Sequence, residues 1–303
     1  MRAVTDTPTG TEGGPPSGPL RAAAWVTRAG PLALDRPRVM GVLNLTPDSF
    51  WGGSRFAGAA AAVEAAGRMV EAGAALLDIG GESTRPGAAP VGEDEEIRRV
   101  LPALEAVVRA FPALPVSVDT VRSATARAAL AAGAAAVNDV SGLRLDPDLA
   151  DAVAGAGAGL ILMHSRGGIG DMASYDLADY GPDPVAEVIA ELEGSRRTAL
   201  ERGVAPEAIA LDPGLGFAKT TAESVAVLRG LDRLSALGAP VVIGASRKRF
   251  VGDLSADAPP EHRLAGTLAA CVVAYLRGAR IFRVHDVPEA VRALDVAAAL
   301  ADT

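Results

Sequence analysis

Eight short aliphatic runs alternate with Ala-, Leu- and Val-rich stretches of helical composition, and this alternation predicts a (β/α)8 TIM barrel built as a single α/β domain. The runs lack the alternation of polar and apolar residues that marks a half-exposed strand, as expected for parallel strands covered on both faces. Each run ends in polar, charged or glycine-bearing residues. Because the carboxyl ends of all strands in such a barrel surround one site, we expect these endings to meet there.

The barrel accounts for most of the 303 residues. Residues 1–19 are rich in Thr, Pro and Gly and are predicted to form a disordered tail. Residues 20–36, which hold Trp25 and a Gly-Pro pair, predict an N-terminal hairpin that closes the bottom of the barrel. The barrel itself is assigned to residues 37–303, close to the length of about 250 residues that is typical of this fold.

The aliphatic runs give the expected strands, in chain order, at residues 39–43, 76–79, 116–118, 135–138, 159–163, 209–212, 241–244 and 280–284. The stretches between them are long enough for the crossover helices that parallel strands require. Residues 58–72 and 184–203 are two such helical stretches.

Charge and cysteine content exclude several classes of protein. The chain has 29 Lys and Arg against 37 Asp and Glu, a formal net charge of −8, so we expect no nucleic-acid partner, which would need a basic face. The only cysteine, Cys271, stands in an apolar stretch and is expected to be a small buried residue. The sequence shows no secretory signal and no apolar run of about 20 residues, which predicts a soluble cytoplasmic protein without a membrane partner.

The first strand ends at Asn44 and opens into a loop that contains Thr46, Pro47 and Phe50. An ordinary turn that caps the next helix is one interpretation of its Pro-Asp-Ser segment. The loop continues through a Gly-Gly pair to Phe56, however, and this length favours a loop that closes over a ligand.

The second strand ends at Asp78, which is followed by a glycine pair, Glu82, and then Thr84, Arg85 and Pro86. A surface ion pair between Arg85 and Glu82 is the simple interpretation of this segment. A second loop at the rim of a site is the functional one, and the residues alone leave both open.

Polar side chains at three more strand ends form a candidate floor for the site. Asp119, Asn138 and Asp212 end the third, fourth and sixth strands. Carboxylates and amides buried there need partners, which a heterocycle rich in donors and acceptors would supply; the alternative is that they hold loops together. The segment from Asp212 to Lys219 is glycine-rich, but Ala218 stands where a phosphate-binding P-loop needs glycine, so a P-loop is excluded.

The seventh and eighth strands end in basic residues, at the place where barrels frequently bind phosphate. The cluster consists of Ser246, Arg247, Lys248, Arg283 and His285. One such cluster alone is often a solvated face, but two on neighbouring strand ends favour an anion site. The segment around Ser246 lacks the second glycine of a nucleophile elbow, and none of the three histidines has zinc-ligand spacing, so we expect neither a serine hydrolase nor a zinc site.

Together these endings predict one site with a polar floor and an anion corner, the latter made by Arg283 and His285 with Asn44 nearby. Such a site suits a flat heterocycle that carries a phosphate or pyrophosphate. A divalent ion such as Mg2+ would bind largely through the phosphates of the substrate, with one ligand from the protein.

Six ordered motifs resemble the dihydropteroate synthase family of the folate pathway. They lie at residues 44–50, 80–88, 138–142, 211–217, 246–248 and 283–287. The resemblance implies a (β/α)8 fold and the condensation of 6-hydroxymethyl-7,8-dihydropterin pyrophosphate with p-aminobenzoate, which yields 7,8-dihydropteroate and pyrophosphate. Members of the family are commonly homodimers, so the resemblance also implies a homodimer.

The resemblance implies a role for each matching residue. The pterin would be held by Asp119, Asn138, Asp212 and Lys248, in a slot shaped by Met163 and Phe217. The pyrophosphate would be bound by Arg283, His285 and Asn44, with Asn44 as the protein ligand of Mg2+. The p-aminobenzoate would be framed by Ser246, Thr46, Pro47, Phe50, Thr84, Arg85 and Pro86. Loss of pyrophosphate would give a cationic methylene group that the aniline nitrogen captures, with Asp119, Lys248, Arg283 and His285 as catalytic residues.

The first loop departs from the family pattern. It reads Phe50-Trp51-Gly52-Gly53, one residue shorter than the usual sequence and without its aspartate. This departure is the only support for one alternative, a non-catalytic paralogue that binds pterin. The other alternative, a pterin-dependent methyltransferase on the same barrel, would have no need for the anion corner. The residues assign no role to His164.

Overall fold

The computed structural model describes residues 22–45, 55–82 and 91–301. Within these residues, parallel strands form an eight-stranded sheet in the order β8-β7-β6-β5-β4-β3-β10-β9. The bounds are β3 Arg38–Asn44, β4 Leu76–Gly80, β5 Val116–Asp119, β6 Ala136–Asp139, β7 Gly159–Met163, β8 Ile209–Asp212, β9 Val242–Ile243 and β10 Ile281–Val284. A parallel bridge between Leu211 and Val241 joins the two edges of the sheet and closes the barrel. The predicted fold class is therefore confirmed.

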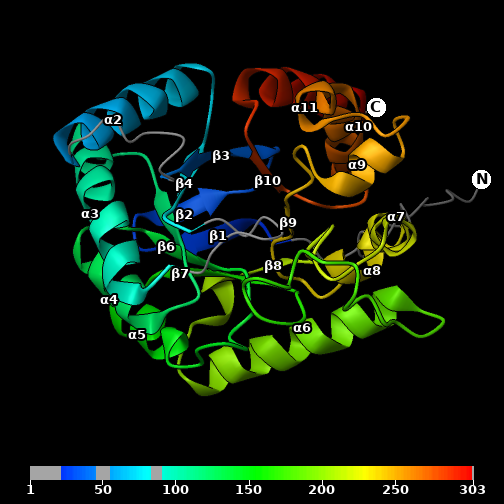
Figure 1. Ribbon diagram of the computed structural model, residues 1–303, viewed down its shortest axis with the longest axis horizontal. Helices are drawn as coiled ribbons and strands as arrows, with labels where there is room; N and C mark the ends of the chain where they lie inside the picture. Colours follow the sequence, from blue (N-terminus) through cyan, green and yellow to red (C-terminus); the bar gives the residue numbers. More distant parts are fainter. Residues whose placement is uncertain (1–21, 46–54, 83–90, 302–303) are drawn as a thin grey trace, which may run out of the picture.

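Helices surround the barrel on the outside (Figure 1). Their bounds are α2 Arg55–Glu71, α3 Glu93–Ala110, α4 Ser123–Ala131, α5 Leu149–Ala156, α6 Pro184–Glu201, α7 Thr221–Arg229, α8 Leu231–Ser235, α9 Arg249–Asp253, α10 Leu264–Leu276 and α11 Val287–Ala301, with short 3-10 turns η1 Pro206–Ala208 and η2 Pro260–His262. Local sequence starts several of them. Asp183 accepts a hydrogen bond from the backbone N–H of Ala186 at the start of α6, and a capping box between Thr220 and Glu223 starts α7.

The predicted elements agree closely with the observed ones. The fifth and sixth strands of the barrel coincide with β7 and β8, and the helices expected at 58–72 and 184–203 correspond to α2 and α6. The seventh strand is shorter than expected, because β9 holds only Val242 and Ile243 of the predicted run 241–244. Cys271 is buried, as predicted. None of the helices in the described ranges is long and apolar enough to cross a membrane.

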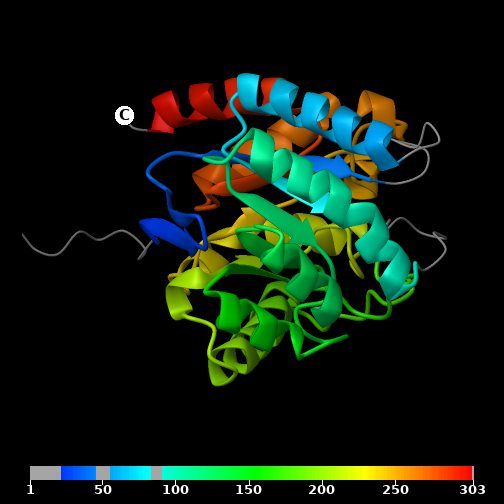
Figure 2. The same ribbon diagram turned by 90° about the vertical axis from the view of Figure 1, so that its left-hand side faces the viewer.

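A hairpin closes the bottom of the barrel, as the sequence predicts. Strands β1 Ala24–Thr27 and β2 Gly30–Ala33 pair antiparallel, and they lie at one end of the barrel (Figure 2). Trp25 is fully buried there, and its indole N–H donates to the carbonyl oxygen of Ala208 at 2.7 Å. Its ring packs so closely on Gly159 that an added Cβ would lie 2.7 Å from a ring carbon. The predicted disordered tail, residues 1–19, lies outside the described residues.

The interior of the barrel next to Trp25 is a layer of apolar side chains from seven of the eight barrel strands, all except β5. Its members are Met40, Leu76, Ala136, Ile161, Ala210, Val242 and Ile281, which cluster with Trp25 and Leu34. A second and larger cluster fills the space between the strands and the helices. The apolar filling at this end leaves the opposite, carboxyl end of the barrel for polar side chains.

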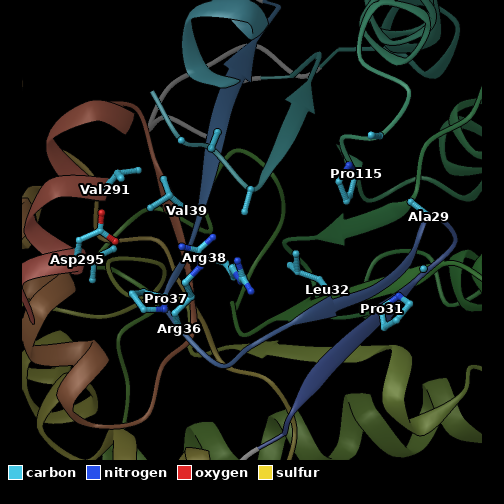
Figure 3. Close-up of a pocket in the computed structure, with 16 residues that line it drawn as sticks. Ala29, Pro31, Leu32, Arg36, Pro37, Arg38, Val39, Pro115, Val291 and Asp295 are labelled. Carbon is cyan, nitrogen blue, oxygen red and sulfur yellow. The ribbon is translucent and has the colours of Figure 1, made fainter. Parts of the chain in front are cut away.

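A cavity of about 460 Å³ lies at the hairpin end, between the hairpin, the start of β3 and α11 (Figure 3). Leu32, Arg38, Pro115, Val291 and Asp295 are among the residues around it. None of the residues that line it is a predicted site residue. The cavity is therefore separate from the site to which the sequence points.

Candidate active site

Arg283 joins three strands across the carboxyl end of the barrel. It lies in β10, and its Nε donates to Asp78 Oδ2 of β4 at 2.6 Å, while its Nη2 donates to Asp119 Oδ2 of β5 at 2.7 Å. These pairs connect residues 205 and 164 positions apart in the sequence. Two ion pairs to different strands hold the guanidinium group in one orientation.

Asp78 is the centre of this network. Its side chain is fully buried, and its two oxygens accept hydrogen bonds from Ser117 Oγ, Asn138 Nδ2 and Arg283 Nε. The bond from Asn138 measures 3.1 Å and fixes the orientation of that amide at the end of β6. The polar residues Asp78, Asn138 and Arg283, from three different strands, therefore form one connected network. Their common partner is Asp78, a residue of the protein, rather than a ligand.

Asp212 and Lys248 lie on the other side of the same end of the barrel. Asp212 Oδ1 accepts from the backbone N–H of Gly214 at 2.7 Å, and Lys248 Nζ donates to the carbonyl oxygen of Leu215 at 2.6 Å. Both groups border Gly244, since a Cβ added there would lie 3.7 Å from Lys248 Nζ and 3.8 Å from Asp212 Oδ2. Asp212 is buried, and burial raises the pKa of its carboxyl group, although the charge of Lys248 opposes this shift.

An apolar wall stands beside these polar groups. Met163 and Phe217 belong to one buried cluster with Val121, Val140 and Met172. The ammonium nitrogen of Lys248 lies 4.2 Å from the centre of the Phe217 ring. The sequence predicts Met163 and Phe217 as the walls of a slot, whereas the other three members were not singled out, because isolated apolar residues after a strand carry no distinctive signal.

His285 and Ser246 are coupled at the ends of β10 and β9. Ser246 Oγ accepts from the backbone N–H of His285 at 3.2 Å and lies 3.0 Å from His285 Nδ1, to which its hydroxyl can donate. Arg247 next to Ser246 pairs with Asp286 next to His285, with its Nε donating to Oδ2 at 2.9 Å. Its backbone is left-handed, with φ of 57°, and a carboxylate already engages the guanidinium that the sequence assigns to the cationic corner.

Asn44 ends β3 and pairs in register with Gly80 of β4. Its side chain is half-buried at the same end of the barrel as Asp78 and Asp119. Among the described residues there is no group of three or more His, Cys, Asp or Glu side chains that could hold a metal ion. Asn44 offers one amide oxygen at this end of the barrel, which would suit a cation that takes its other ligands from a bound phosphate and water.

Burial shifts the protonation equilibria of the site. Burial raises the pKa of Asp119 to about 7, although the charge of Arg283 opposes this shift. It lowers the pKa of Lys248 to about 8, with Asp212 acting in the opposite direction. Burial also acts to lower the pKa of Arg283, but Asp78 and Asp119 outweigh it and raise that pKa. Arg283 is therefore a permanent cation, whereas Asp119 and Lys248 change charge near neutral pH.

Six predicted contacts of p-aminobenzoate lie outside the described residues: Thr46, Pro47, Phe50, Thr84, Arg85 and Pro86. Glu82, which the sequence suggests as a surface partner for Arg85, is bound to Arg122, whose Nη1 donates to Glu82 Oε2 at 2.8 Å; Arg85 itself lies outside the described residues. Arg122 follows β5 and was not singled out in the sequence, since nothing in its neighbourhood marks it as different from a solvated arginine.

Comparison with known proteins identifies the family. The profile of the family described as "Pterin binding enzyme" matches residues 40–285. A dihydropteroate synthase of Synechocystis is 43% identical over 265 residues, which cover 88% of this chain and 90% of that protein. The solved structure of Xanthomonas albilineans dihydropteroate synthase with 4-aminobenzoic acid is 45% identical, has a TM-score of 0.85, and covers 93% of this chain and 99% of its own.

A second structure of the X. albilineans enzyme, in complex with 7,8-dihydropteroate, has a TM-score of 0.79 at 44% identity and covers 90% of this chain and 97% of its own. Identity and coverage of this size extend over the whole barrel and all the strand ends described above. The chain therefore belongs to the dihydropteroate synthases of the pterin-binding enzyme family.

Proposed function

We propose that this protein condenses 6-hydroxymethyl-7,8-dihydropterin pyrophosphate with p-aminobenzoate, which gives 7,8-dihydropteroate and pyrophosphate in folate biosynthesis. The observation that carries the proposal is the network in which Arg283 links Asp78 and Asp119, opposite Asp212 and Lys248, at one end of the barrel. This arrangement places carboxylates and cations around a slot with an apolar wall. It suits a pterin that carries a pyrophosphate.

The pterin lies in the slot beside Met163 and Phe217 in this proposal. Its ring nitrogens and amino group bond to the carboxylates of Asp119 and Asp212 and to the amide of Asn138, and its carbonyl oxygen accepts from Lys248. Each of these side chains is already oriented by a bond within the protein or by packing, so little conformational entropy is lost on binding. The described geometry therefore favours a planar donor- and acceptor-rich ring over a flexible ligand.

The pyrophosphate lies next to Arg283, His285 and Asn44. The two ion pairs use two of the five N–H groups of the Arg283 guanidinium, so three remain for phosphate oxygens among the described contacts. In the tautomer in which the Ser246 hydroxyl donates a hydrogen bond to Nδ1 of His285, the ring proton is on Nε2, and we assign this N–H to the leaving group. These donors stabilise the negative charge that develops on the departing pyrophosphate.

The bond that breaks joins the exocyclic methylene carbon of the pterin to the bridging oxygen of the pyrophosphate, which leaves with the bonding electrons. The aniline nitrogen of p-aminobenzoate then forms a bond to that carbon and releases one proton. Asp119 stabilises the positive charge that the pterin carries between these two events. One charge-assisted hydrogen bond contributes about 1.5–3 kcal/mol, or roughly tenfold to a hundredfold in rate if it forms mainly in the transition state.

In this proposal Mg2+ would be held by Asn44 and by phosphate oxygens of the substrate. When bound, the ion neutralises charge on the pyrophosphate. We further propose that p-aminobenzoate lies next to Ser246 and the segments that hold Phe50 and Arg85, and that the protein is a cytoplasmic homodimer. Sedimentation velocity tests the dimer.

Release of pyrophosphate by the purified protein is the direct test. It is measured with Mg2+, dihydropterin pyrophosphate and p-aminobenzoate present together, and with each omitted in turn, while dihydropteroate is followed by chromatography. We expect pyrophosphate release and dihydropteroate formation only with both substrates. Pterin binding without turnover would identify a non-catalytic paralogue, and methyl transfer from methyltetrahydrofolate would identify a methyltransferase.

A further inference from the structure

A second lysine, besides Lys248, lies on the segment that follows Asp212 and Phe217. Lys219 is fully buried, and its ammonium nitrogen is close to three acceptors: the carbonyl oxygens of Gly214 and Phe217, each at 3.1 Å, and Nδ1 of His164 at 2.8 Å. An ammonium group has three N–H donors. All three are therefore used within the protein, and this lysine has no hydrogen left for a substrate.

The bond to His164 fixes the state of the imidazole. Burial lowers the pKa of His164 to about 4, so the ring is neutral at physiological pH. Since Nδ1 accepts from Lys219, the ring proton is on Nε2, which lies 3.0 Å from Glu191 Oε2 and donates to it. Glu191 is in turn bound by Arg166. The buried ammonium is thus connected through one imidazole to a half-exposed carboxylate on α6.

The segment that Lys219 holds has an uncommon backbone. Gly214, Gly216 and Ala218 all have positive φ, of 64°, 75° and 45°. Gly214 packs so closely on the strand end before it that an added Cβ would lie 1.9 Å from the carbonyl oxygen of His164. A backbone of this kind persists only where its surroundings fix it. Lys219 holds the segment by donating to the carbonyl oxygens of Gly214 and Phe217, and Lys248 holds it by donating to the carbonyl oxygen of Leu215.

This segment contains or contacts two of the residues that the proposed function assigns to the pterin, Phe217 and Asp212. Gly214 donates its backbone N–H to Asp212, and Phe217 forms part of the apolar wall. A shift of the carbonyl oxygens at 214 and 217 would therefore move both the carboxylate and the ring that face the pterin. It would leave Ser246 and His285, which lie on other strands, in place.

We propose, as an extension of the proposed function, that Lys219 is a positioning residue for the pterin: its ammonium group ties Gly214 and Phe217 to the His164–Glu191 pair and so holds the slot in the conformation that binds. Lys219 does not touch the substrate. Its loss weakens binding of the pterin while the p-aminobenzoate side of the site is preserved.

Pterin binding should depend on pH, because burial lowers the pKa of Lys219 to about 7. A neutral amine has two N–H donors for three acceptors, so one of the carbonyl oxygens or His164 loses its bond when the proton leaves. Pterin affinity should therefore fall as pH rises through this range. The charged or polar groups that face Lys219 are His164 after β7, Glu191 on α6, Arg166 and Tyr180 in the loop between them, Asp212 of β8, and Lys248 after β9.

The first test is the affinity of Lys219→Met for dihydropterin pyrophosphate with Mg2+, measured by calorimetry, which requires no turnover. We expect the Kd to rise about tenfold to a hundredfold, equivalent to about 1.4–2.7 kcal/mol, and the KM for p-aminobenzoate to stay within about twofold wherever turnover is measurable. Trp25→Ala, which removes a buried side chain at the opposite end of the barrel, is the matched destabilised control and should retain wild-type affinity. A folded Lys219→Met protein with wild-type pterin affinity would overturn the inference.

A second variant decides the matter even if Lys219→Met does not fold. Glu191→Gln keeps an oxygen acceptor for His164 but removes a negative charge that supports the protonated state of Lys219. We expect unchanged pterin affinity at about pH 5, where the lysine is protonated in both proteins, and an affinity loss whose midpoint lies about one pH unit lower than in the wild type. Asp119 and Lys248 titrate in both proteins, so the difference between the two profiles isolates Lys219. If pterin affinity had the same pH dependence in Glu191→Gln as in the wild type, the role of Lys219 would be contradicted. If the wild-type protein bound the pterin but released no pyrophosphate, only the proposed function would be contradicted.

Discussion

Arg122 offers a quantitative test of how buried charge supports this fold. Its Nη1 donates to Glu96 Oε2 and to Glu82 Oε2, each at 2.8 Å, and its Nη2 donates to the carbonyl oxygen of Val91 at 2.7 Å. The side chain of Glu96 is fully buried, and that of Glu82 is 8% exposed. Arg122 is therefore the cation that compensates two carboxylates removed from water.

Replacement by methionine keeps the aliphatic volume and removes the charge. Breaking a buried ion pair from one side costs about 3–5 kcal/mol, because the remaining charge stays buried without compensation. Glu96 retains only the hydroxyl of Thr125 as a donor at Oε2, and its Oε1 has no hydrogen-bond partner among the described residues. We therefore expect Arg122→Met to lower the free energy of unfolding by an amount in this range.

Urea unfolding followed by circular dichroism measures the loss. Arg68→Met is the matched control, because its pair with Glu64 is exposed on α2 and should contribute only about 0.2–0.5 kcal/mol. The double variant Arg122→Met/Glu96→Gln removes the orphaned charge as well and should recover about 1–3 kcal/mol of the loss. A loss in Arg122→Met no larger than in the control, or no recovery in the double variant, would refute the reasoning.

The same variant tests a link to the site. Glu82 and Val91, which Arg122 holds together, flank the segment that contains Thr84, Arg85 and Pro86. Under the proposed function, we expect the KM for p-aminobenzoate to rise roughly threefold to tenfold, or about 0.7–1.4 kcal/mol, with the KM for the pterin within about twofold of wild type. Equal effects on both KM values would indicate a general loss of structure instead.

Four further variants test the hairpin end, the pterin side of the site and the backbone at two glycines. Trp25→Ala should lower the free energy of unfolding by about 3–5 kcal/mol in denaturant titrations, with kcat/KM at 25 °C unchanged, since the ring packs at the end opposite the site. Lys248→Met should raise the pterin KM about tenfold or more through loss of a charge-assisted bond. It should also remove from the pH–rate profile the fall in activity above about pH 8, where the wild-type lysine loses its proton. Gly214→Ala should lower the free energy of unfolding in denaturant titrations by about 2–5 kcal/mol, because backbone strain adds to overpacking. Gly238→Ala is the control: its φ is 75° and nothing lies within 4 Å of the added Cβ, so it should lower the free energy of unfolding only by the strain, about 1–2 kcal/mol.

Much of the fold could be predicted because each strand of the barrel lies in a short, largely apolar run, although Asp78, Ser117 and Arg283 interrupt three of these runs. Every run expected from the sequence contains a strand, and the polar residue after it lies at the carboxyl end of the barrel. Local composition is sufficient for this, since parallel strands buried on both faces need no alternation. The hairpin could be predicted for a similar reason: a Gly-Pro pair between two short apolar segments leaves few other conformations.

The pairing of charged side chains could not be predicted in the same way. Arg283 reads as a free anion-binding residue, yet it is bound to Asp78 and Asp119, because strands distant in sequence are neighbours around the barrel. Arg247 and Lys248 are adjacent in sequence but have different partners: Arg247 pairs with Asp286, and Lys248 donates to the carbonyl oxygen of Leu215. Arg247 has a left-handed backbone, which its sequence does not indicate because it is not a glycine. Side-chain direction after a strand depends on loop dihedrals, and composition does not encode them.

The pairing of Arg283 changes how the anion corner should be understood. A guanidinium between two carboxylates carries no excess positive charge, so it is a weak site for a free anion. In the proposed reaction, however, the pterin becomes positive as the pyrophosphate becomes more negative, and Arg283 lies between carboxylates and the phosphate position. The carboxylates then stabilise one developing charge while the remaining N–H donors of Arg283 stabilise the other. We infer that this network binds the separated charges of the transition state better than those of either substrate or product, which is the condition for catalysis rather than tight binding.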